Sequence, residues 1–109
     1  MRALARRAAP RSDARAPGAL RLDPATHAMH ASERVVVLTP TEFRLLATLV
    51  ARPGDVVRRR ELIAAAWPDG AIVHDNTLDT YVRRLRRKLR EFAVDDEIAT
   101  ARGVGYSLR

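Results

Sequence analysis

The sequence predicts an α+β domain in which short antiparallel strands precede three helices and a hairpin closes the chain. Three observations predict this order. Extended segments separated by turn residues lie before residue 39, apolar residues recur at helical spacing from 39 to 92, and an extended stretch with a central glycine turn lies at 98–108. The 109 residues form one domain at most, because a single core takes about 100–150 residues. A multidomain enzyme is therefore excluded.

The domain is expected to run from residue 19 to 109. Residues 1–18 are mainly Ala, Arg and Pro with little apolar surface to bury, which is typical of a linker, and residues 2–7 are compatible with the last turn of a preceding helix. Three short extended segments then predict an antiparallel meander: Leu20–Leu22, Thr26–His30 and Arg34–Leu38.

The clearest helix start in the sequence is Thr39-Pro40-Thr41-Glu42. The Thr39 hydroxyl and the Glu42 carboxylate can each accept the free backbone N–H of the other residue, and proline suits the first helical position. This first helix is expected to end before Pro53-Gly54. Its apolar face consists of Phe43, Leu46, Leu49 and Val50.

Two further helices are predicted downstream. The second runs from about 59 to 67, where Pro68 stops it, and the brief extended pair Val56-Val57 precedes it. The third is the longest, is expected to be capped by Asp75, and runs to about Phe92. Its core face covers an arc of about 100° and consists of Leu78, Tyr81, Val82, Leu85, Leu89 and Phe92.

The face of the third helix that points away from the core is strongly basic. It comprises Asn76, Thr80, Arg83, Arg84, Arg87 and Arg90. Between residues 83 and 90, six of eight positions are basic and none is acidic, and the whole chain carries a net charge of +7. Like charges three and four positions apart on a helix repel each other, so an anionic partner is expected. Because asparagine, threonine and arginine hydrogen-bond base edges and a helix fits the major groove, that partner is predicted to be DNA.

An arginine stands at the turn of the predicted C-terminal hairpin, Ile98–Leu108. Arg102, next to Gly103, can extend into a narrow minor groove, whose negative potential attracts guanidinium groups. The predicted fold class is therefore α+β, a winged helix-turn-helix with an N-terminal antiparallel sheet, three helices and a C-terminal β-hairpin wing.

Residues 38–108 resemble the DNA-binding effector domain of OmpR/PhoB-type two-component response regulators. The matching segments are Leu38–Leu46, Pro53–Val57, Glu61-Leu62 with Trp67, Thr77–Leu89 and Thr100–Tyr106. The resemblance implies transcriptional control by sequence-specific binding to double-stranded DNA. It also implies a four-stranded N-terminal sheet and a hairpin that pairs with the short strand between the first two helices. Residues 19–38 supply three candidate strands, so a fourth strand is either hidden near Ala31-Ser32 or absent.

The resemblance further implies which residues touch DNA. The recognition helix of the family matches Asn76 to Leu89. Within it, base and nearby phosphate contacts are implied for Thr77, Thr80, Arg83 and Arg84, and a contact with the DNA backbone is implied for Arg87. Trp67 touches a phosphate at the end of the second helix, and the wing contributes Thr100, Arg102, Gly103 and Tyr106, with Arg102 in the minor groove. The loop implied to touch RNA polymerase contains Pro68, Asp69, Gly70, Ala71, Ile72, Val73 and His74.

One departure from the family pattern lies at the start of the second helix. Arg58 and Arg59 stand where a serine or threonine cap is usual. Positive charge at a helix N-terminus is unfavourable unless it binds phosphate. The two residues are therefore either an additional DNA-backbone contact or a poorer cap.

Besides DNA, three protein partners are implied: a histidine kinase, a second copy of the domain on DNA, and RNA polymerase. A receiver domain needs roughly 100–150 further residues, so the cognate histidine kinase is expected to act through a receiver absent from this chain. On DNA, two copies are expected in tandem on direct repeats, and the polymerase is expected at the loop named above. The isolated domain is expected to be monomeric, because no apolar stripe remains after the core is assigned.

Two alternatives to a response regulator remain. Membrane-anchored one-component activators use a similar cytosolic winged helix, but there it continues into a spanning helix, whereas this chain ends one residue after Leu108. A basic winged helix can also serve contact with RNA or protein, although Asn76, Thr77 and Thr80 would then have no explained role.

Other classes of site find little support in the sequence. It has no cysteine, no glycine-rich phosphate loop and no placed catalytic triad, so neither an enzyme nor a cofactor is expected. His27 and His30 would face opposite sides of a strand, which argues against a metal site. No apolar stretch of 18 residues occurs, so we expect a cytoplasmic protein without a membrane span.

Overall fold

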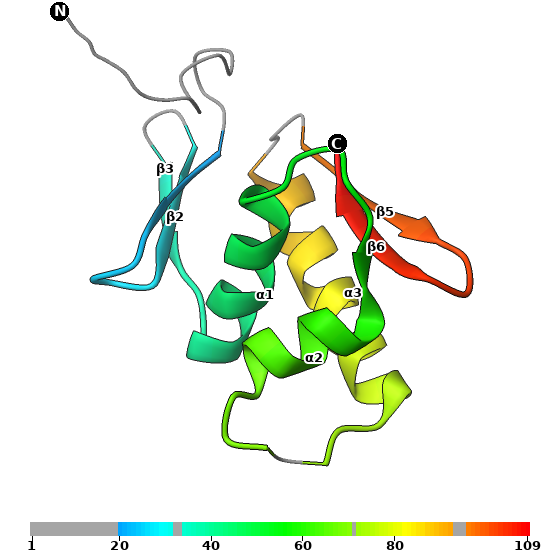
Figure 1. Cartoon of the computed structure of the whole chain (residues 1–109). Helices are drawn as coiled ribbons and strands as arrows, with labels where there is room; N and C mark the ends of the chain where they lie inside the picture. Colours follow the sequence, from blue (N-terminus) through cyan, green and yellow to red (C-terminus); the bar gives the residue numbers. More distant parts are fainter. Residues whose placement is uncertain (1–19, 32–33, 71, 93–95) are drawn as a thin grey trace, which may run out of the picture.

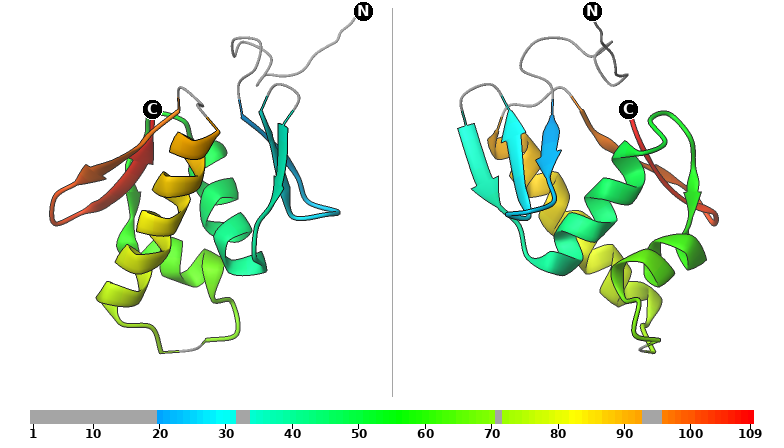
Figure 2. Two further views of the ribbon diagram at one scale, coloured as in Figure 1. Left: turned by 180° about the vertical axis from the view of Figure 1, so that it is seen from behind. Right: turned by 60° about the vertical axis from the view of Figure 1, so that its left-hand side comes forward.

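Two small sheets flank three helices in the structure, a computed structural model that describes residues 20–31, 34–70, 72–92 and 96–109 (Figure 1). In chain order the elements are β1 (Arg21–Asp23), β2 (Ala28–Ala31), β3 (Arg34–Val37), α1 (Pro40–Val50), β4 (Val57–Arg58), α2 (Arg59–Ala66), α3 (Asp75–Glu91), β5 (Ile98–Ala101) and β6 (Gly105–Leu108). The sheets have the orders β1-β2-β3 and β4-β6-β5, and the helices lie between them (Figure 2). The predicted winged helix-turn-helix is thereby confirmed, while the predicted linker, 1–18, lies outside the described residues.

The N-terminal sheet turns a row of apolar side chains toward the helices. Met29 pairs with Leu22 on one side and with Val36 on the other, and its side chain is fully buried. The second strand begins later than the sequence predicts, because residues 24–27 form a turn in which His27 has a φ of 57°. Among the described residues this sheet has three strands, the number that residues 19–38 predict, and the fourth implied by the resemblance is not among them.

The predicted capping box at the start of α1 is confirmed and extends to α3. Thr39 Oγ1 accepts the Glu42 N–H at 3.2 Å, and Glu42 Oε1 accepts the Thr39 N–H at 3.0 Å. The Glu42 carboxylate is 3% exposed, and the same oxygen accepts a hydrogen bond from Lys88 Nζ at 2.7 Å. Burial opposes ionisation, but the hydrogen bonds from Lys88 and Thr39 outweigh it and hold the pKa of Glu42 below its ordinary value. The cap of α1 therefore also anchors α3.

Acid is expected to remove the stability that the charge of Glu42 contributes. Because the folded-state pKa lies below the unfolded value of about 4.3, the contribution is complete above that value and is lost as the pH falls through the folded pKa. At pH 7, Glu42→Gln should lower the free energy of unfolding by about 1–3 kcal/mol. The difference in free energy of unfolding between Glu42→Gln and the wild type should disappear between about pH 5 and pH 2, as measured by urea unfolding.

Glu61→Gln is the matched control for this experiment. Glu61 pairs with Arg52 at 2.8 Å, but both side chains are more than 40% exposed, so solvent screens the pair and its loss should cost less than about 1 kcal/mol. A gap between Glu42→Gln and the wild type that persists unchanged into acid would contradict the assigned role of the Glu42 charge.

The third helix has the predicted core face but not the predicted cap. Its buried residues are Leu78, Val82, Leu85 and Leu89, and Tyr81 and Phe92 pack partly buried against them. The prediction that Asp75 caps the helix is wrong, because Asp75 is already helical and His74 occupies the N-cap without a side-chain hydrogen bond. The Asp75 carboxylate lies 3.7 Å from Arg59 Nε, and its charge in the first turn complements the helix dipole.

The C-terminal sheet joins the wing to the segment before α2. β6 is its central strand, which pairs with β5 along the hairpin and with β4 through Val57–Tyr106 and Arg58–Gly105. The pairing of the hairpin with the strand between the first two helices is thereby confirmed. The hairpin turns at 102–104, where Gly103 has a φ of 76°, a conformation that glycine adopts at little cost.

Candidate nucleic-acid interface

The basic residues of α3 divide into two groups. Arg86 and Lys88 are bound within the domain, Arg86 to the wing and Lys88 to Glu42. The other four are exposed and form no ion pair or hydrogen bond with the described residues: Arg83, Arg84, Arg87 and Arg90. The Arg84 guanidinium carbon lies 4.9 Å from the centroid of the Tyr81 ring, which supports that side chain from beneath. Four exposed positive charges therefore lie on one helix face without an ion pair or hydrogen bond to the described residues, although the charge of Arg83 acts on the nearby carboxylate of Asp79.

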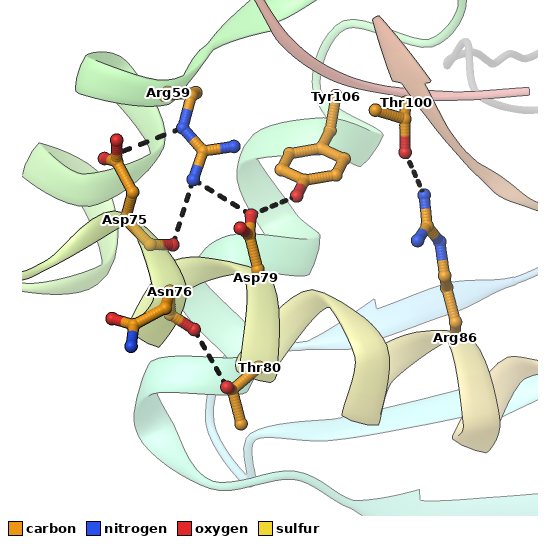
Figure 3. Close-up of polar contacts among 8 residues, drawn as sticks. All are labelled: Arg59, Asp75, Asn76, Asp79, Thr80, Arg86, Thr100 and Tyr106. Carbon is orange, nitrogen blue, oxygen red and sulfur yellow. Dashed lines mark hydrogen bonds and ion pairs between the residues drawn. The ribbon is translucent and has the colours of Figure 1, made fainter. Parts of the chain in front are cut away.

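The polar residues at the start of α3 lie at the end of this arginine face. Asn76 is exposed, and Thr77 and Thr80 are half-buried. The Thr80 hydroxyl donates to the Asn76 backbone oxygen at 2.8 Å (Figure 3). Its proton is thus used inside the helix, which leaves the Thr80 oxygen as an acceptor and the methyl group as a possible partner for a thymine methyl.

The segment between α2 and α3 begins at a packed aromatic pair. Trp67 is half-buried, and its ring meets that of Tyr81 edge to face at a centroid distance of 5.3 Å. In the following loop, Pro68, Asp69, Gly70 and His74 are exposed and Val73 is half-buried. Ile72 is 93% exposed, the largest exposure among the large hydrophobic residues described. Ala71 lies outside the described residues.

The residues of the wing differ strongly in their exposure. Arg102 and Gly103 are exposed at the tip, and Arg102 has no partner among the described residues. Thr100 is exposed as well, and its Oγ1 accepts a hydrogen bond from Arg86 at 2.6 Å. Tyr106, by contrast, is 5% exposed, and its hydroxyl donates to Asp79 of α3. The wing thus presents its tip to solvent and its base to α3.

The two arginines at the start of α2 have separate surroundings. Arg58 is exposed and occupies the N-cap without a side-chain cap hydrogen bond. Arg59 is half-buried and donates to the Asp75 backbone oxygen and to Asp79 Oδ1, both at 2.9 Å (Figure 3). The hydrogen bond from the Tyr106 hydroxyl lowers the pKa of Asp79 below its ordinary value, and the hydrogen bond and charge of Arg59 add to this effect. Partial burial of the carboxylate opposes it. Of these two arginines, Arg58 is therefore the one whose charge is exposed and has no ion pair or hydrogen bond within the described residues.

Comparison with known proteins identifies the family. Residues 33–108 match the family "Transcriptional regulatory protein, C terminal". The chain belongs to this family. Over 91 residues it is 44% identical to the phosphate regulon transcriptional regulatory protein PhoB of Rhizobium meliloti, a match that covers 84% of the chain and 40% of that protein. The OmpR/PhoB-type resemblance inferred from the sequence is thereby confirmed.

A second relative and a solved structure agree with this assignment. The transcriptional regulatory protein TcrA of Mycobacterium tuberculosis is 40% identical over 111 residues, covering 100% of the chain and 44% of TcrA. The chain thus spans about two-fifths of the length of these relatives. The DNA-binding domain of the response regulator AdeR, solved in complex with an intercistronic region, superimposes with a TM-score of 0.72 at 30% identity, covering 82% of this chain and 90% of that one.

Two other observations concern the classes of site set aside from the sequence. The described residues contain no helix long and apolar enough to cross a bilayer. The His27 ring packs against Phe43 at a centroid distance of 5.1 Å, while His30 lies in β2 between Arg21 and Val35. The two histidines are therefore parts of the sheet and its turn rather than of a common cluster.

Sequence reasoning did not find the residues that fix this family member's wing to its helices. Asp79 and Arg86 hold the wing, and Gly105 lets β4 lie close to β6. Asp79 carried a signal, since it is the one acid between Asp75 and Glu91 in an otherwise basic helix. Arg86 carried none, because it lies within the run from 83 to 90, where six of eight residues are basic.

Proposed function

We propose that this domain binds double-stranded DNA in a sequence-specific manner and controls transcription as the effector domain of a two-component response regulator. The observation that carries the proposal is the face of four exposed arginines on α3, which form no ion pair or hydrogen bond with the described residues. Phosphates are the partners that such a face lacks, and α3 has the diameter that fits the major groove. Membership of the family and the likeness to the AdeR domain support the same function.

The proposed contacts follow the exposure of each side chain. In the major groove, Thr80 and Arg84 read bases together with Asn76, Thr77 and Arg83. Backbone phosphates are met by Arg58, Arg87 and the edge of Trp67. Arg102 enters the minor groove, where Gly103 allows close approach of the wing and Thr100 lies beside the backbone.

Further partners belong to the same proposal. The loop 68–74 is proposed to contact RNA polymerase, which its exposed Ile72 supports, because large apolar residues at 93% exposure are typical of contact sites. Input from a histidine kinase would reach the domain through a receiver domain, with residues 1–18 as the linker. The extra length of the relatives supports this, since the chain spans about two-fifths of it.

Two copies are expected to bind in tandem on direct repeats whose centres are about 10–11 bp apart, one helical turn of DNA. A helix in the major groove and a wing in the adjacent minor groove give each copy a direction along the duplex, so an identically oriented neighbour meets the same groove one turn on. Selection of bound sequences from random duplex DNA at fixed salt should recover such a repeat. Mobility-shift titration on sites with altered spacing should then show the preference.

The spacing series also supplies the control. Adding about 5 bp places the second site on the opposite side of the duplex and should abolish the shift with two copies bound, whereas about 10 bp should restore part of it. Recovery of an inverted repeat, or equal affinity at all spacings, would contradict the tandem arrangement. Selection of an RNA, with no enrichment of any duplex, would favour the RNA-binding alternative.

A further inference from the structure

The Asp79 carboxylate joins three elements of the domain at one oxygen. Asp79 Oδ1, on the first turns of α3, accepts from Arg59 of α2 at 2.9 Å and from the Tyr106 hydroxyl of β6 (Figure 3). Burial and the adjacent carboxylate raise the pKa of Tyr106 above its ordinary value, so its hydroxyl is a donor at neutral pH. The helix that carries the arginine face is thus bonded directly to the central strand of the wing sheet.

A second connection lies two helical turns further along α3. Arg86 Nε donates to the Ile98 backbone oxygen at 2.9 Å, and a terminal nitrogen of Arg86 donates to Thr100 Oγ1 at 2.6 Å. Thr100 is the direct cross-strand partner of Tyr106, so α3 holds both strands of the hairpin at the same level. The Tyr106 ring lies between the two arginines, with guanidinium carbons 5.8 Å (Arg59) and 5.6 Å (Arg86) from its centroid.

The position of these contacts matters for the tip of the wing. Arg102 stands two residues beyond Thr100, and the turn that carries it is exposed. A small change in the angle between β6 and α3 at Tyr106 is therefore enlarged at Arg102. The contacts at Asp79 and Arg86 fix this angle before DNA is bound, which reduces the entropy that the wing loses on binding.

We infer that Tyr106 and Arg59 are positioning residues that act through Asp79 to place Arg102 at a fixed distance from the reading face of α3. This inference rests on the proposed function and changes the role of both residues from DNA contact to support. The Tyr106 hydroxyl donates its proton to Asp79, and Arg59 Nη2 donates to Asp75 and Asp79, so both side chains are held in place by groups of the domain itself.

A double-mutant cycle tests the inference. In the wild type, Arg102→Ala should weaken binding to the selected DNA site about tenfold. In the Tyr106→Phe background, which keeps the buried ring and removes only the hydroxyl, Arg102→Ala should cost no more than about twofold, because the wing no longer meets the groove at a fixed angle. Affinities are measured by fluorescence anisotropy at one salt concentration.

Two controls separate positioning from a loss of stability. Tyr106→Phe combined with Arg90→Ala should be additive, because Arg90 lies at the far end of α3 and outside the wing contacts. Thr48→Val removes a hydroxyl whose hydrogen bond, to the Arg44 backbone oxygen at 2.8 Å, stays within α1, and it should leave the effect of Arg102→Ala unchanged. The unfolding midpoint of each variant shows that it is folded at the assay temperature.

The outcomes distinguish this inference from the proposed function. Failure of the wild type to bind any duplex would overturn the proposed function. If the wild type binds DNA but Arg102→Ala has the same effect in both backgrounds, or no effect in either, the positioning role is overturned while DNA binding stands.

Discussion

Raising monovalent salt from about 50 mM to about 200 mM should weaken DNA binding by one domain several hundredfold. Each phosphate neutralised by a basic side chain contributes a slope of about −0.9 in log K against log salt. The exposed cations that we count toward phosphate contacts are Arg58 at the start of α2 and the four arginines of the α3 face, whereas Arg59, Arg86 and Lys88 are bound internally. We therefore expect roughly four to five phosphate contacts and a slope of about −3.6 to −4.5.

Two arginine variants should respond differently in the same titrations. Arg87→Ala should reduce the magnitude of the slope by about 1 and weaken selected and random duplexes alike, because it removes a backbone contact. Arg84→Ala should cost about 1–3 kcal/mol on the selected site and relax base preference, because it removes a base contact. A wild-type slope near zero would refute the DNA proposal and favour a protein partner.

Local signals in the sequence were sufficient wherever neighbouring residues determine the outcome. The capping box at Thr39 and Glu42 needs only residues three positions apart, and the structure has it as predicted. The core face of α3 follows from helical spacing alone, and Leu78 to Leu89 are buried accordingly. Asp75 was misassigned as a cap because capping depends on which residue keeps an extended backbone, and composition does not distinguish His74 from Asp75 in that respect.

The division of the charged residues could not be predicted, because it depends on contacts distant in sequence. Lys88 meets Glu42 across 46 positions, and Asp79 meets Tyr106 across 27. On a helical wheel, Arg86 and Arg87 are both basic residues outside the core face, and only the placement of the wing decides that one is bound and the other free. The sequence thus predicted that α3 exposes a basic face. It did not predict the internal contacts of Asp79, Arg86 and Lys88 that hold this helix in place.

Gly105→Ala should lower the free energy of unfolding more than the same change at the other glycines described by the structure. A Cβ at Gly105 would lie 1.9 Å from the Val57 carbonyl oxygen and 2.9 Å from its carbonyl carbon, both backbone atoms of β4. The residue pairs with Arg58, so relief of the clash requires β4 and β6 to separate. We expect the free energy of unfolding, measured with urea, to fall by about 3 kcal/mol or more, which is at the upper end for overpacked sites.

Separation of the two strands should also reduce DNA binding, because β4 leads directly into α2 and β6 carries Tyr106 toward α3. Gly103→Ala is the matched control: a Cβ there meets no atom within 4 Å, and only its φ of 76° opposes the change. That backbone strain should cost about 1–2 kcal/mol. If Gly105→Ala destabilises the domain no more than Gly103→Ala does, β4 is not held against β6, and the wing is attached to the helices through Asp79 and Arg86 alone.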